Sequence, residues 1–413
     1  MAPVPVARPR ASLLLLAYLA FVSLGLPDGL IGVGWPSMRR DLGVPTEAVG
    51  LLLFAGTTGY LTSSVLAGFT LARLGVGRLL AVSTLLASLA LTGYASAPHL
   101  TMLIGCALML GLGSGAIDSG LNAYAAGAFG PRHMNWMHAF FGLGVAIGPL
   151  IMTGVLSVGL SWRWGYGSVA AAQLALALAF ALTVRAWRDR GPAAASAPAP
   201  PGGGPDTTTP VPAVAPTLAP VRVRDTLRLP AAWLGALAFA VYVAIEVAAG
   251  LWAFLLLTEG RGVSAAVAGG AVSAYWGSLF VGRVVQGVVA ERLGTAGILR
   301  GSLLGMAVGA ALVAVPGPAW LAVAGLVVIG FAAAPVFPLL TLTTAERVGA
   351  AHADRVIGLQ IGAAGLGAAL VPAGVGVLIS RTSVEALGPA LLVLAVVLLI
   401  VHATGTRRPP SVA

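Results

Sequence analysis

The chain has 413 residues, of which 58% are hydrophobic and only 9% are charged. An ordinary soluble domain has roughly 25% charged residues, so the composition excludes a soluble globular protein and indicates one embedded in a lipid bilayer. The net charge of +10 would suggest a nucleic-acid partner in a soluble protein, but the placement of the charges explains it better here. Cys106 is the one cysteine in the sequence, which excludes an intrachain disulfide and any metal or redox site built from thiols.

Twelve apolar segments are long enough to cross roughly 30 Å of hydrocarbon. The first is longer than the apolar core of a signal peptide and contains Pro27 and Asp28, so we expect it to be retained as a helix. The sequence therefore predicts an all-α membrane protein with 12 transmembrane helices. In chain order the segments lie near residues 11–38, 46–72, 77–95, 99–128, 136–158, 163–186, 231–258, 264–290, 296–315, 318–345, 353–380 and 385–403.

Arginine accounts for all 23 basic residues, and its distribution predicts the orientation of the chain. With the N-terminus inside, 17 arginines fall in cytoplasmic segments, five fall outside and Arg283 falls within a span. The positive-inside rule then predicts that both termini are cytoplasmic, as in a multi-pass protein of a bacterial inner membrane. The five arginines expected outside are Arg39, Arg40, Arg163, Arg261 and Arg381.

A segment rich in Pro, Ala, Gly and Thr, residues 187–230, separates the sixth and seventh apolar segments. It cannot bury a core, so we interpret it as a cytoplasmic linker between two six-helix halves, residues 1–186 and 231–413. The halves repeat, and parallel repeats of this kind predict a transporter that works by alternating access. An offset of 219 positions aligns Gly43 with Gly262, Gly50 with Gly269, Gly68 with Gly287, and the run from Arg73 to Gly75 with the run from Arg292 to Gly294.

The loop between the second and third segments reads GFTLARLGVGR and resembles the loop signature of the major facilitator superfamily. That signature has a glycine, an acid four residues later, an arginine and a Gly-Arg pair. Here Ala72 replaces the acid, whereas the second copy, GVVAERLG, keeps it as Glu291. The resemblance implies the major facilitator fold, with two pseudo-symmetric six-helix halves, and a loop that braces neighbouring helices on the cytoplasmic side. The residues concerned are Gly68, Arg73, Gly75 and Arg78 in the first copy and Gly287, Glu291, Arg292 and Gly294 in the second.

Within that superfamily, three segments resemble the group of fucose, galactose and glucose proton symporters. GLPDGLIGVGWP places Asp28 in the first helix, GAIDSGLNAY places Asp118 in the fourth, and NWMHAFFGLGVAIGP is similar to the fifth helix of the group. The resemblance implies that Asp28 handles the proton and contributes to the sugar site, while Asp118 supports coupling. The fourth-helix acid is Asp where the fucose symporter pattern has Glu, so its carboxylate reaches one methylene less far.

Asp28, Asp118 and Glu246 fall in the middle third of their spans. A charge at that depth costs at least about 2.5 to 3.5 kcal/mol, so such acids face a cavity or a partner and are functional by default. Desolvation disfavours the ionised carboxylate, which suits a group that takes up and releases a proton. Asn122 shares a helix face with Asp118, and Glu246 falls within one position of Asp28 under the repeat offset. We expect Asp28 and Asp118 to couple protons. We expect Asp28, Asn122 and Glu246 to bind solute. The alternatives are a buried structural hydrogen bond for Asp28, a bond to a neighbouring helix for Asp118 and a structural pair for Glu246.

Sugar sites combine aromatic faces with amide and carboxylate groups, and the candidates favoured here are Trp252, Trp276 and Gln360. Packing inside the bundle is the alternative for each of them. Arg283 lies roughly 13 Å into the membrane, where a cavity-facing position would favour an anionic solute and a snorkelling one would not. His138 is either a helix-contact residue or a proton relay.

The sequence favours proton-coupled symport of a sugar or similar small polar solute. The alternative is proton-coupled efflux of drugs or metabolites, since GVAIGP, from Gly144 to Pro149, resembles a fifth-helix antiporter motif whose following glycine pair is missing. The spans hold no metal-ligand pair and no activated nucleophile, so we expect neither an enzyme nor a metal site. The expected partners are the solute, protons and the lipid bilayer, with the proton gradient in place of a cofactor, and the protein is expected to work as a monomer.

Overall fold

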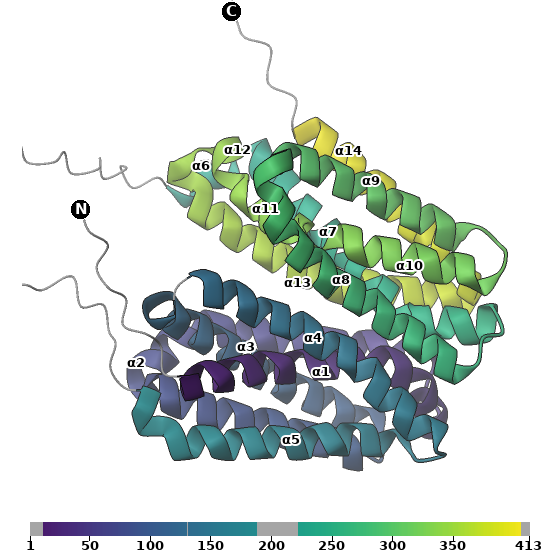
Figure 1. Ribbon diagram of the computed structural model, residues 1–413, viewed down its shortest axis with the longest axis horizontal. Coiled ribbons are helices and arrows are strands. Elements are labelled where there is room, and N and C mark those ends of the chain that lie inside the picture. The colour runs from purple at the N-terminus through teal and green to yellow at the C-terminus, as the bar shows by residue number, and fades with distance from the viewer. Residues whose placement is uncertain (1–10, 130, 188–221, 406–413) are drawn as a thin grey trace, which may run out of the picture.

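The computed structural model describes residues 11–129, 131–187 and 222–405. Every regular element within these ranges is helical, and 11 helical segments are long and apolar enough to cross a membrane. Figure 1 shows the helices in two groups, one formed by the first part of the chain and the other by the last part. Residues 188–221, which make up most of the predicted linker, lie outside the described residues.

The first group contains five long helices, one of which crosses the membrane twice. A straight helix of 48 residues would be about 72 Å long, more than twice the hydrocarbon thickness. The second long helix is interrupted at Gly75, where φ is 70° and ψ is 163°, and so supplies both the second and the third predicted spans. The elements are α1 (Ala11–Leu42), η1 (Thr46–Ala48), α2 (Val49–Ser96), α3 (Leu100–Ala128), α4 (Pro131–Ser157), α5 (Trp162–Thr183) and η2 (Val184–Trp187).

The second group supplies the remaining six spans, one of which is divided between two helices, α10 and α11. Together with the first group this confirms the predicted count of 12. The elements are α6 (Val223–Leu227), α7 (Pro230–Leu255), η3 (Leu256–Gly260), α8 (Ala265–Leu293), α9 (Thr295–Ala314), α10 (Ala319–Ala333), α11 (Val336–Leu342), α12 (Thr344–Val348), α13 (Ala350–Arg381), η4 (Val384–Ala386) and α14 (Leu387–Gly405).

The internal repeat is visible in the backbone at two pairs of matched glycines. Gly43 and Gly262 have φ of 65° and 64°, and Gly75 and Gly294 both have φ of 70°. Glycine populates this left-handed region without the steric cost that a Cβ imposes. The residues that repeat in the sequence therefore mark the same turns in both groups.

Glycines also set the distance between helices inside the first group. A Cβ on Gly29 would collide with the backbone oxygen of Val145, and a Cβ on Gly144 would collide with that of Val22. On α3, a Cβ on Gly111 or Gly115 would likewise collide with backbone oxygens of α2. Small residues allow this contact of backbones, which membrane helices use because lipid gives them no hydrophobic driving force to associate.

Both ends of the described chain, and both ends of the linker, lie at one end of the bundle, which we call the linker end (Figure 1). The two groups diverge toward the linker end and approach each other toward the opposite, distal end. Close contacts at the distal side include Gly32 against the backbone of Gly250 and Gly50 against Ala373. The five arginines expected on the outside all lie at helix ends on the distal side.

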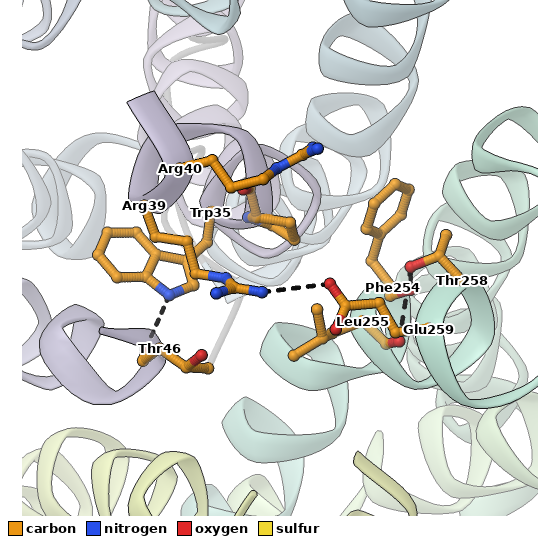
Figure 2. A network of polar contacts seen from close by, with 9 residues as sticks. Trp35, Arg39, Arg40, Thr46, Phe254, Leu255, Thr258 and Glu259 are labelled. Carbon is orange, nitrogen blue, oxygen red and sulfur yellow. Dashed lines mark hydrogen bonds and ion pairs between the residues drawn. The ribbon is translucent and has the colours of Figure 1, made fainter. Parts of the chain in front are cut away.

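Three ion pairs occur within the described ranges, and all lie at the distal end. Arg163 with Asp41 and Arg261 with Glu385 each connect elements of the same group. Arg39 of α1 with Glu259 of η3, separated by 3.2 Å, joins the two groups, and we call this pair the distal latch. Figure 2 shows the latch beside Trp35, whose indole N–H donates to the backbone oxygen of Thr46.

Candidate functional site

Asp28 lies in the middle of α1, directly after Pro27. It is the one exposed residue between Ala20 and Arg39, although the side chain lies deep among surrounding protein atoms. The exposed Leu15 and Leu19 lie on the opposite face of the helix, so the accessibility of Asp28 is not contact with lipid. Within the described part of the chain its carboxylate has no hydrogen-bond donor and no cationic partner. This is the geometry of a carboxylate on the wall of an internal aqueous space.

The charge of Asp28 acts on the hydroxyl groups of three tyrosines. Tyr60 and Tyr94 come from α2, and Tyr166 comes from α5. The rings of Tyr94 and Tyr166 lie 4.8 Å apart between centroids. The hydroxyl of Tyr166 is buried and has no hydrogen-bond partner among the described residues, which is a costly state for a polar group.

Asp118 of α3 differs from Asp28 because both of its carboxylate oxygens already accept a hydrogen bond. The Tyr60 hydroxyl donates to one oxygen at 2.6 Å, and the Asn122 amide donates to the other at 2.9 Å. The spacing of four residues therefore does place Asn122 against Asp118 on one helix face. The amide oxygen of Asn122 is buried without a donor, so it can accept a hydrogen bond from a hydroxyl group. The charges of both Asp118 and Asp28 act on the Tyr60 hydroxyl.

Glu246 of α7 forms the equivalent acid in the second group. The Tyr242 hydroxyl, one helical turn earlier, donates to its carboxylate, and the Tyr275 hydroxyl of α8 donates to its backbone oxygen at 2.7 Å. The positive charge of Arg283 also acts on Glu246, although the two groups do not form an ion pair. Each group of helices thus carries a tyrosine bonded to an intramembrane acid.

Arg283 and His138 meet where α8 of the second group packs against α4 of the first. A guanidinium nitrogen of Arg283 donates to the backbone oxygen of His138 at 3.3 Å. His138 is exposed, and its ring contacts the Phe21 ring edge-on with 5.2 Å between centroids. The negative charge of Asp118 also acts on the His138 imidazole. The sequence does not predict that these two residues lie together, because 145 positions separate them.

Trp252, Trp276 and Gln360 lie in the packed interior. Trp252 is 1% exposed and its indole N–H donates to the backbone oxygen of Pro372 at 3.0 Å. Trp276 packs against Gly250 and the ring of Tyr275. Gln360 is 3% exposed and accepts a hydrogen bond from Thr344 at 3.0 Å. A solute cannot reach these side chains in this conformation, and their predicted binding role stays a prediction.

The loop motif of the first half lies at the linker end, where Gly75 makes the turn within α2. Arg73 and Arg78 are exposed and form no ion pair with any described residue. A cavity of about 260 Å³ adjoins the turn and is lined by Arg78 and Trp187 among others. In the second copy, Gly294 makes the matching turn. Gly287 and the side chains of Glu291 and Arg292 belong to the part of α8 whose side chains the structure does not describe.

One comparison with known proteins shows the family, and another shows which solved structures share the fold. A family model described as Major Facilitator Superfamily matches residues 17–372 and 247–412. The fold is similar to a crystal structure of the nucleoside transporter NupG, with a TM-score of 0.74 and 14% identity over 96% of this chain and 100% of that one. It is also similar to the Major Facilitator Superfamily transporter FucP in the outward conformation, with a TM-score of 0.60 and 14% identity over 96% and 99%. At this identity the likeness concerns the fold. No curated protein sequence matches the chain.

Proposed function

Because the chain belongs to the Major Facilitator Superfamily of transporters, we propose that it is a proton-coupled symporter for a sugar or similar small polar solute. Membership makes it a multi-pass membrane transporter of small-molecule solutes. The symport of protons rests on a different observation. Asp28 is an intramembrane carboxylate that is both accessible and without a hydrogen-bond partner among the described residues.

In this proposal Asp28 carries the proton. A carboxylate without a donor gains most from protonation before the loaded carrier reorients, since its charge is otherwise uncompensated inside the membrane. Asp118 has a different role, because its two oxygens are held by Tyr60 and Asn122. It orients Tyr60, on whose hydroxyl the charges of both acids act, and so tunes Asp28 rather than exchanging protons itself. Asn122 offers a free amide oxygen to a solute hydroxyl.

Alternating access follows from the separation of the two groups of helices. With the linker end in the cytoplasm of a bacterium, as the arginine distribution predicts, the divergence of the groups toward that end corresponds to an inward-open state. Rocking of the groups about the central contacts would open the distal end to the outside. Each copy of the chain contains both groups, which supports transport by a monomer.

The test is solute uptake into proteoliposomes under an imposed pH gradient, with the orientation of the protein established. An outside-acidic gradient should drive accumulation by the wild type. Asp28→Asn should abolish gradient-driven accumulation while it retains exchange of solute between the two sides. Asp118→Asn should keep the dependence on the gradient but reduce the rate. Asp225→Asn, an exposed acid of α6, is the control and should behave as wild type.

Two results would contradict the proposal. If Asp28→Asn accumulates solute as the wild type does, the proton is carried elsewhere. If an inside-acidic gradient drives accumulation instead, the protein is an antiporter, which is the efflux alternative.

A further inference from the structure

We propose that Arg283 binds a carboxylate group of the transported solute, so that the substrate is a polyhydroxylated acid such as a sugar acid. This inference rests on the proposed function and specifies its substrate class. It starts from the position of Arg283 on α8. The exposed residues Val267, Ala274 and Val281 recur along one face of this helix, and Arg283 lies on the opposite face. The side chain therefore starts from the face of α8 that is turned away from lipid.

Among the residues whose side chains are described, none forms an ion pair with the guanidinium group of Arg283. It forms none of the three ion pairs found in the described ranges, and its one hydrogen bond goes to the backbone oxygen of His138. A guanidinium has five N–H donors in a planar fork that matches a carboxylate in a bidentate arrangement. An intramembrane cation is costly without a partner of opposite charge. A single guanidinium provides one positive charge, which suits a monovalent carboxylate better than a phosphate dianion.

The surroundings of Arg283 place a bound solute between the two groups of helices. Its one hydrogen bond among the described residues crosses to α4, and the exposed His138 lies on the face of α4 opposite the exposed Trp136 and Leu150. Gly142, one turn after His138, lies beside the guanidinium, since a Cβ there would be in van der Waals contact with it at 3.8 Å. A solute held at this seam contacts both groups, as substrate-driven rocking requires.

Glu246 acts as an internal competitor for Arg283. The charge of Arg283 acts on its carboxylate, which is held by Tyr242 rather than in an ion pair. An incoming solute carboxylate therefore takes the place beside the Arg283 guanidinium that the carboxylate of Glu246 could otherwise occupy. Removal of the two groups should have opposite effects, because one attracts the solute and the other competes with it.

The experiment measures binding and proton-coupled uptake for a panel of aldonates, uronates and short hydroxy acids, each paired with the neutral sugar or polyol of equal carbon number. Binding is followed by the thermal stabilisation of the purified full-length protein. We expect an acid to bind and its neutral counterpart not to. Arg283→Gln should weaken that binding by about 10- to 100-fold, and Arg283→Lys should weaken it less. Glu246→Gln should tighten it severalfold, and Arg300→Gln, at an exposed position of α9, should change nothing.

The outcomes separate this inference from the proposed function. Proton-driven uptake of a neutral sugar with no binding of acids would overturn the assignment of Arg283 and leave symport intact. Equal binding of the acid by wild type and Arg283→Gln would also overturn it, as would binding of sugar phosphates in place of carboxylates or no binding of any acid in the panel. Binding of an acid whose uptake ignores the pH gradient would retain the assignment of Arg283 and refute proton coupling. The tighter binding expected of Glu246→Gln is a gain in affinity, which a folding defect cannot produce.

Discussion

Disruption of the distal latch should shift the protein toward the outward-open state. Arg39 and Glu259 form the one ion pair that joins the two groups of helices in the described ranges, and their side chains are 24% and 49% exposed. Partly exposed pairs contribute about 0.2 to 1 kcal/mol. Glu259→Gln should therefore raise the ratio of distally open to distally closed protein by about 1.4- to 5-fold, since every 1.4 kcal/mol is a factor of ten.

The distance between spin labels at the distal ends of α4 and α10 measures this shift. Val158 and Trp320 are 71% and 67% exposed, so labels there disturb no packing, and Cys106 can first be replaced by Ala to leave no other thiol. Glu259→Gln should enlarge the population with the longer distance, and the exchange Arg39→Glu with Glu259→Arg should restore the original distribution. Arg40→Gln removes a neighbouring exposed arginine that has no ion pair and serves as the control. An unchanged distribution in Glu259→Gln, or an equal change in Arg40→Gln, would refute the latch.

Two further predictions concern packing. Gly144→Val places a side chain against the backbone of Val22 and should destabilise the protein by roughly 1 to 3 kcal/mol in detergent unfolding, whereas Gly154→Val, on the same helix without a neighbour, should cost less. Equal losses in both variants would mean that helix propensity, not the contact with α1, determines the effect. Trp252→Phe removes the hydrogen bond to Pro372 and should lower stability by about 1 kcal/mol without a change in solute affinity, because the ring is buried. A large drop in affinity at unchanged stability would instead support the binding role predicted from the sequence.

The fold could be predicted from the sequence because the membrane imposes strict conditions on it. Apolar segments of sufficient length must form helices in the membrane, because backbone N–H and C=O groups without a hydrogen bond are too costly in hydrocarbon. The repeat of Gly75 and Gly294 marks turns that favour glycine, and this is why the division of α2 into two spans was predictable. The short helices α6 and α12 were not, because five residues carry no periodicity that separates a helix from a loop.

The candidate site was predictable only in part. An acid in an apolar span is visible in the sequence, but the direction in which its side chain points is not. Sequence spacing placed Asn122 beside Asp118, since both lie on one helix. It could not place Tyr60 there, 58 residues away on another helix. In the same way it could not distinguish a tryptophan in a binding site from Trp252, which fills the space between α7 and α13.

The hydrogen bonds of the intramembrane acids also have a mechanical consequence. Asp118 and Tyr60 tie α3 to α2, and Tyr275 ties α8 to α7 at the backbone of Glu246. Each tie crosses between neighbouring helices near the middle of the bundle. A force applied at Asp118 or at the backbone of Glu246 is therefore shared by two helices rather than absorbed by a single side chain. In the proposed function, the residues that respond to proton and solute thus also hold neighbouring helices together, so that each half moves as a rigid body.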